Sequence, residues 1–181
     1  KNLEVKDVHL GKRCFILGSG PSMKNIDLDK LKDEYVIVLN EFDRHLQFKS
    51  LKFVNHVVSD PFYFVEDKDT YFWERLKNKS DSASPNTVFF FHVKGKELVE
   101  KENLFAKNKV YYLSTHGIIS DHFDFNIELD KNLPWPKNSL LSCLMIAVYM
   151  GFREIYLLGF EHSFLAIHIG PEQGKAKTFD H

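Results

Sequence analysis

Six short apolar runs, each four to six residues long, are spread along the chain and constrain its fold more than any other feature. They comprise residues 14–17, 35–39, 53–58, 87–92, 110–115 and 154–158. A short run without polar alternation is typical of a strand buried on both faces of a parallel sheet. Because helical segments alternate with these runs and no internal repeat is visible, we predict an α/β fold with a mostly parallel sheet flanked by helices.

Helical spacing predicts the segments between the strands. We expect helices over residues 26–32, about 64–79, 96–102 and 138–150, a loop over 80–86, and an irregular stretch over 117–137. In the first of these, Leu28 and Leu31 lie three residues apart and therefore share one face. The last is the best supported, because its apolar residues repeat at helical spacing after a capping Asn138-Ser139 pair.

The first strand runs directly into the turn Gly18-Ser-Gly-Pro-Ser22. Glycines there permit positive φ and close approach of a ligand to the backbone, while Pro21 fixes its own φ. The hydroxyl of Ser22 would lie where backbone N–H groups converge, an arrangement that suits an anionic oxygen. A tight strand-to-helix turn without any ligand explains the same residues equally well.

Other polar residues follow the predicted strands and should gather with this turn at one edge of the sheet. The carboxyl ends of parallel strands form the ligand-binding edge of open α/β sheets. The residues expected there are Ser19, Ser22, Asn40, Asp60, Asn138, Ser139, Glu161 and His162. Simple turn and cap roles remain open for Asn40, Asn138 and Ser139, and a solvated loop for Glu161 and His162.

Composition narrows the functional classes. With 24 basic and 25 acidic residues, the chain has no overall charge that would favour nucleic acid or an anionic membrane. Cys14 and Cys143 fall in apolar segments, which predicts small buried hydrophobes in a reducing, cytoplasmic compartment. No apolar run reaches the roughly 20 residues of a membrane span. We expect a single domain over residues 1–181, trimmed at its C-terminal end, and leave open whether it forms a homo-oligomer.

The order of motifs resembles two related groups of proteins. The motifs are Gly18-Ser-Gly-Pro-Ser22, Asn40, Asp60-Pro61, the Asn138-Ser139 helix start and Gly151-Phe-Arg-Glu-Ile-Tyr-Leu-Leu-Gly159. Together they resemble the bacterial sialyltransferases of glycosyltransferase family 42. They equally resemble the motility-accessory and polysaccharide-cluster proteins that include 6-hydroxymethylpterin pyrophosphokinases.

The resemblance to the sialyltransferases implies a Rossmann-like variant of the GT-A fold that transfers a sialic or related nonulosonic acid from a CMP-activated donor to a glycan acceptor. It implies no metal and no other cofactor. By position, Gly18, Ser19, Gly20 and Ser22 would contact CMP, Asn40 and Asp60 the nucleotide, and Asn138, Ser139, Glu161, His162 and Ser163 the donor sugar or phosphate. The family's general base would be His181 or His168.

The chain also departs from the family pattern. Ser163 and Phe164 stand where a tyrosine is expected, Pro136 replaces an arginine, and Leu140 replaces a glycine. Two alternatives therefore stay open. A pyrophosphokinase would need Mg²⁺ held by carboxylates such as Asp60 and Glu161, and a binding domain would use the same edge without catalysis. Asp27-Leu-Asp29 looks like a metal-binding motif, but a solvated helical face explains it better.

Overall fold

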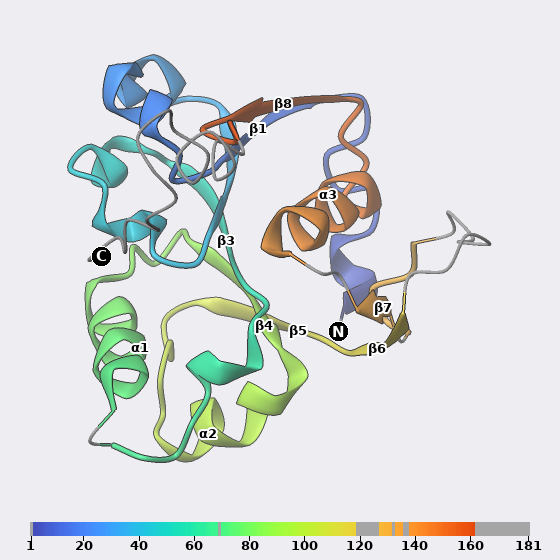
Figure 1. Ribbon diagram of the computed structural model, residues 1–181. Coiled ribbons are helices and arrows are strands. Elements are labelled where there is room, and N and C mark those ends of the chain that lie inside the picture. Colours follow the sequence, from blue (N-terminus) through green and yellow to red (C-terminus); the bar gives the residue numbers. More distant parts are fainter. Residues whose placement is uncertain (1, 69, 119–126, 132, 136–137, 162–181) are drawn as a thin grey trace, which may run out of the picture.

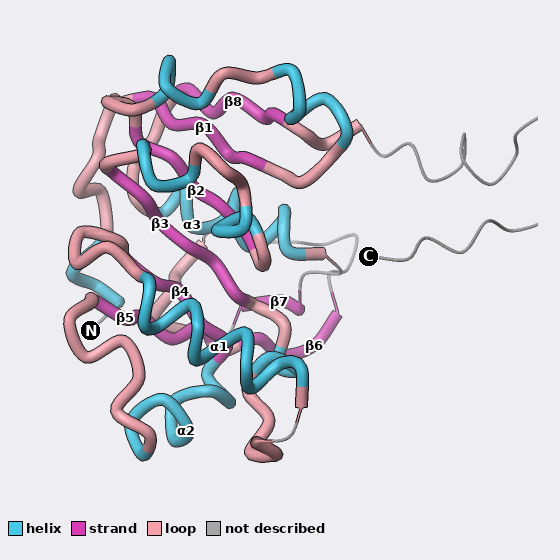
Figure 2. Tube along the Cα trace, turned by 90° about the vertical axis from the view of Figure 1, so that its left-hand side faces the viewer, coloured by secondary structure: helices cyan, strands magenta, loops and turns pink. Residues whose placement is uncertain are grey.

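A six-stranded, fully parallel sheet forms the centre of the protein, in the order β5-β4-β3-β2-β1-β8 (Figures 1 and 2). The computed structural model describes residues 2–68, 70–118, 127–131, 133–135 and 138–161. Its strands are β1 (Arg13–Leu17), β2 (Tyr35–Leu39), β3 (Phe53–Val58), β4 (Val88–His92), β5 (Lys109–Leu113) and β8 (Glu154–Leu158). The predicted α/β class and parallel sheet are confirmed, and the arrangement is Rossmann-like.

The order of the strands places a change of direction beside β1. The chain adds β2, β3, β4 and β5 one after another on one side of β1, and then crosses back to lay β8 on the other side. The helix α3 (Ser139–Tyr149) makes this return. Ligands of open α/β sheets bind at such a switch point, beyond the carboxyl ends of the strands.

Strand β4 shows why the sheet is covered on both faces. Phe89, Phe90 and Phe91 follow one another in this strand and all three are buried. Side chains alternate between the faces of a strand, and accordingly Phe90 belongs to one core cluster while Phe89 and Phe91 belong to another. A strand with three consecutive buried phenylalanines requires a covering layer on each side.

Helix α3 supplies the layer on one face, and α1 and α2 contribute to the layer on the other (Figure 1). The buried residues Cys143 and Ile146 of α3 pack in one cluster with Cys14, Ile37 and Phe90 of the strands. On the opposite face, α1 (Tyr71–Ser82) and α2 (Lys96–Lys101) contribute to the cluster around Phe89 and Phe91. Burial raises the pKa of both cysteine thiols, to about 12 for Cys14, so both are inert core residues as predicted.

Short 3₁₀ turns connect many of the elements, and one of them replaces an expected helix. They are η1 (Asn2–Val5), η2 (Pro21–Asn25), η3 (Leu28–Leu31), η4 (Phe42–Arg44), η5 (Phe48–Ser50), η6 (Pro61–Tyr63) and η7 (Val93–Gly95). The predicted helix over 26–32 is thus a single 3₁₀ turn, whose Asp27 side chain accepts a hydrogen bond from the Asp29 N–H. Leu28 and Leu31 do share a buried face, so the spacing identified the buried side chains correctly.

Three other predictions for the segments between the strands were wrong in part. Helix α1 begins at Tyr71 rather than near residue 64, because the Thr70 hydroxyl caps it by accepting from the Trp73 N–H, and it continues to Ser82. The expected loop over 80–86 therefore begins only at Ala83. The stretch predicted as irregular contains β6 (Thr115–Ile118) and β7 (Leu133–Trp135), which pair in a separate two-stranded parallel sheet.

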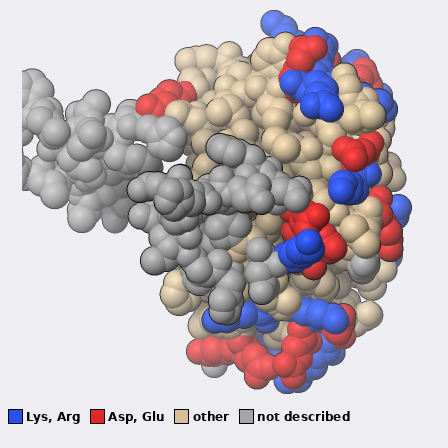
Figure 3. Space-filling model, turned by 90° about the vertical axis from the view of Figure 1, so that its right-hand side faces the viewer, with Lys and Arg blue, Asp and Glu red and all other residues tan. Residues whose placement is uncertain are grey.

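Strand β8 is at the edge of the sheet within the described part of the chain, although its sequence predicted a buried strand. Tyr156 is 42 % and Leu157 46 % exposed. On the molecular face seen in Figure 3, basic and acidic side chains are intermingled, in keeping with the balanced composition. Among the helices of the described residues, none has the length and apolar character to cross a bilayer.

Candidate functional site

Three polar side chains meet at the carboxyl edge of the sheet, each from a different element. Asn40 follows β2, Ser59 follows β3, and Ser139 opens α3. The Asn40 Nδ2 donates to the Ser139 Oγ at 3.3 Å, and the Ser59 Oγ donates to the same oxygen at 3.4 Å. We refer to Asn40, Ser59 and Ser139 as the edge cluster. Sequence spacing predicted that Asn40 and Ser139 share this edge, and the structure brings them into contact.

Asn40 adopts a backbone conformation that side-chain-bearing residues seldom use. Its φ is +48°, in the left-handed region. Asparagine is one of the few residues that tolerate this region, and such conformations gather at functional sites because the surrounding structure must hold them. The Asn40 N–H donates to the Val57 carbonyl at 3.0 Å, which ties the residue to β3. Its carbonyl accepts from His56 Nε2 at 2.8 Å and from Lys79 Nζ at 2.9 Å.

The two donors to this carbonyl are both buried. Burial lowers the pKa of His56 to about 3, with the positive charge of Lys79 acting in the same direction, so the imidazole is neutral at physiological pH. Burial also lowers the pKa of Lys79, against the opposing effect of Asp43. The carbonyl of Asn40 is therefore fixed by one neutral and one charged donor.

At the start of α3, Asn138 has the capping role that the sequence left open. Its Oδ1 accepts from the Leu141 N–H at 3.0 Å, so it satisfies one of the free amides of the first turn. Its neighbour Ser139 instead presents its hydroxyl to the edge cluster. The positive end of the α3 dipole is thereby directed at Asn40 and Ser59.

The glycine turn after β1 differs from the prediction in its backbone. Gly18 and Gly20 do not have positive φ; the glycines of the described residues that do are Gly11, Gly151 and Gly159. A Cβ on Gly20 would lie 2.6 Å from the Gly159 carbonyl oxygen, and one on Gly18 would lie 2.4 Å from it. Close packing against the segment after β8 therefore accounts for both glycines without a ligand.

A carboxylate sits against the same turn. Glu161 Oε1 accepts from the Ser22 N–H at 3.1 Å, and a Cβ on Gly20 would collide with Glu161 Oε2. The backbone N–H at Ser22 thus binds an anionic oxygen, as the sequence predicted for this turn, but the oxygen belongs to the chain itself. Ser19 is exposed beside it.

Asp60 lies at the carboxyl edge but does not join the edge cluster. Its Oδ1 caps η6 by accepting from the Phe62 N–H at 2.9 Å. Its negative charge tends to raise the pKa of His92, at the end of β4, and of Tyr63 in η6. The residue that sequence reasoning missed is its neighbour Ser59, which holds the same position after β3 that Asn40 holds after β2.

The described residues contain no cluster of His, Cys, Asp or Glu suited to a metal ion. Asp27 and Asp29 are exposed on a 3₁₀ turn, as the solvated-face interpretation predicted. Asp60 and Glu161 follow β3 and β8, which are three strand spacings apart, or about 14 Å at roughly 4.8 Å per spacing. His162, Ser163, His168 and His181 lie outside the described residues.

Comparisons with known families, curated proteins and solved structures find no match to this chain. The fold and the geometry of its carboxyl edge therefore carry the functional argument.

Proposed function

We propose that the protein binds a nucleotide at the carboxyl edge of its sheet, with the edge cluster of Asn40, Ser59 and Ser139 as the contact surface. The observation that supports this most strongly is the convergence of these three side chains beside an asparagine in the left-handed conformation. They lie at the edge where open α/β sheets bind their ligands. Most residues of β2, β3 and α3 are buried, so the three side chains extend from well-packed elements, as is typical of binding sites.

The chemistry of the cluster suits a nucleotide. A carboxamide both donates and accepts, so Asn40 matches the edge of a base or a ribose hydroxyl. Serine hydroxyls and the free amides at the start of α3 match phosphate oxygens, which the helix dipole also favours. The hydrogen bonds within the cluster are long, at 3.3 to 3.4 Å, so a ligand can replace them at little loss.

The glycine turn that follows β1 offers a second possible contact for the nucleotide. Its Ser22 N–H already accommodates a carboxylate oxygen of Glu161. A ligand phosphate that used this amide would have to displace Glu161. We therefore assign the turn, with Ser19 and Ser22, to the periphery of the nucleotide site and the edge cluster to its centre.

For the identity of the nucleotide and of the reaction, we follow the resemblance of the sequence motifs to the sialyltransferases. The nucleotide would be the CMP of an activated sialic or related nonulosonic acid, and the reaction would be displacement at the anomeric carbon by a glycan hydroxyl. His181 or His168 would remove the acceptor proton, as a neutral imidazole can near pH 7. The carboxylates named for the pyrophosphokinase alternative, Asp60 and Glu161, follow strands three spacings apart, and Glu161 already accepts from the Ser22 N–H. This particular pair therefore does not converge on one ion.

A melting-temperature panel with CMP, UMP, AMP and GMP tests the binding. Saturation at about 100 times the dissociation constant should add roughly 2.7 kcal/mol to the free energy of unfolding. Ser139→Ala should weaken binding severalfold, because one hydrogen bond contributes about 1 kcal/mol. Ser82→Ala, at the C-terminal end of α1 and outside the edge cluster, is the matched control and should bind normally. If no nucleotide raises the melting temperature, the proposal is wrong.

Turnover of a CMP-activated sialic acid then separates the enzyme classes. The transferase assignment predicts CMP release that depends on an acceptor glycan and persists in EDTA. Activity lost in EDTA would favour the pyrophosphokinase alternative, and tight CMP binding without turnover would leave a binding domain.

A further inference from the structure

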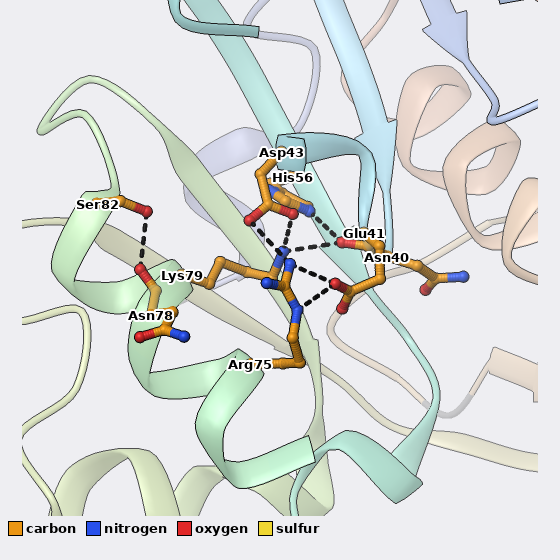
Figure 4. A network of polar contacts seen from close by, with 8 residues as sticks. All are labelled: Asn40, Glu41, Asp43, His56, Arg75, Asn78, Lys79 and Ser82. Carbon is orange, nitrogen blue, oxygen red and sulfur yellow. Dashed lines mark hydrogen bonds and ion pairs between the residues drawn. The ribbon is translucent and has the colours of Figure 1, made fainter. Parts of the chain in front are cut away.

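Lys79 of α1 is almost completely buried beneath the edge cluster, with only 2 % of its side chain exposed. Lysine is seldom buried this far unless its charge is paired. Its Nζ forms an ion pair with Asp43 and donates to the Asn40 carbonyl at 2.9 Å (Figure 4). The ammonium therefore reaches from a helix on the flank of the sheet to the backbone of the proposed binding residue.

His56 reaches the same oxygen from β3. It is 1 % exposed, its ring stacks on Phe89, and its Nε2 lies 2.8 Å from the Asn40 carbonyl oxygen. A carbonyl oxygen has two lone pairs, and these two donors use both. The backbone of Asn40 is thus held from two directions in its left-handed conformation, with φ at +48°.

Two further charges complete the network. Arg75, one turn before Lys79 on α1, pairs with Glu41 and lies within 3.8 Å of Asp43 (Figure 4). The charges of two positive and two negative side chains cancel, which lowers the energetic cost of burying them. Stability alone is a weak reason for such an arrangement, because replacing a buried ion pair by apolar residues is often neutral or stabilising.

We propose that Lys79 and His56 are positioning residues, which hold Asn40 so that its carboxamide faces Ser139 and the bound nucleotide. This inference rests on the function proposed above. The two donors contact the backbone of Asn40, whereas the carboxamide of the same residue contacts Ser139 at the edge. A substitution at Lys79 can therefore weaken ligand binding by changing the orientation of Asn40.

A double-mutant cycle tests the inference by titration calorimetry with CMP. The first perturbation is the charge-balanced pair Lys79→Met with Asp43→Asn, and the second is Asn40→Gly, which keeps the left-handed backbone accessible but removes the carboxamide. We expect the charge-balanced pair to weaken CMP binding about tenfold, but less than twofold when Asn40 is already glycine. Lys77→Met, an exposed lysine on the same helix, is the control and should bind normally.

Equal weakening in both backgrounds, or none in either, would overturn the positioning role. Should the charge-balanced pair not fold, His56→Phe removes the other donor alone and should weaken binding about threefold, again only when Asn40 is present. If CMP does not bind the unmodified protein, or Asn40→Gly binds it normally, the proposed function fails. The positioning role is then decided by NMR, where the side-chain amide signals of Asn40 must shift in the Lys79 variant.

Discussion

Acid should destabilise this protein through one buried histidine, His56. Burial lowers its pKa in the folded protein to about 3, from the ordinary 6.5. Above pH 6.5 the imidazole is neutral in both states, so its contribution to stability is fully present. As the pH falls from 6.5 toward 3, only the unfolded chain takes up a proton, and stability is lost.

The size of this effect follows from the difference between the two pKa values. At pH 4.5, two units below the ordinary value, the unfolded state gains on the order of 3 kcal/mol from protonation of His56. At pH 7.5 the gain is close to zero. His56→Gln keeps an N–H donor for the Asn40 carbonyl but cannot titrate, so this part of the acid sensitivity should vanish.

Urea unfolding, followed by circular dichroism at pH 7.5 and pH 4.5, measures the effect. The unmodified protein should lose on the order of 3 kcal/mol more than His56→Gln between the two conditions, whatever the other histidines contribute to both. Between pH 7.5 and 8.5 the two proteins should change in parallel. Equal losses at pH 4.5 would refute the argument that His56 is kept neutral by burial.

Three substitutions test the packing that supports the site. Gly20→Ala should lower the melting temperature, because its Cβ would lie 2.6 Å from the Gly159 carbonyl oxygen, and an unchanged melting temperature would contradict that close approach. Phe90→Ala should lower the free energy of unfolding in urea by about 3–5 kcal/mol, since the ring is fully buried. Asn138→Ala should lower it by about 0.5–2 kcal/mol through loss of the α3 cap. A near-zero change in either urea measurement would count against the corresponding contact.

The core of the fold was predictable because each apolar run is long enough for only one strand and too uniform for a helix face. Five strands adjacent in sequence are also adjacent in space, so their pairing needs no long-range information. The edge position of β8 was not predictable, because Tyr156 and Leu157 are as apolar as core residues. The pair β6 and β7 was missed since each strand is very short and Pro134 interrupts the usual strand pattern.

Part of the candidate site was predictable from the positions of polar residues at the ends of the predicted strands. Asn40 and Ser139 follow from the rule that strand ends meet at one edge, and Ser59 could have been found by the same rule. The buried charged network of Lys79, Asp43, Arg75 and Glu41 could not be predicted from the sequence. Lys79 contacts residues 36 and 39 positions earlier in the chain, and nothing in a charged, aromatic helix marks one of its lysines as buried. Close packing of Gly18 and Gly20 against Gly159 could not be predicted either, because it joins segments about 140 residues apart in the chain.

A CMP titration followed by two-dimensional ¹H–¹⁵N NMR tests the central claim most directly. We predict saturable shifts that are largest at the backbone amides of Asn40, Ser59 and Ser139, with smaller shifts at Ser19 and Ser22. Residues of α2, which covers the sheet around β4 and β5, should not respond. An absence of saturable shifts, or shifts confined to residues away from the carboxyl edge, would contradict a nucleotide site at the edge cluster.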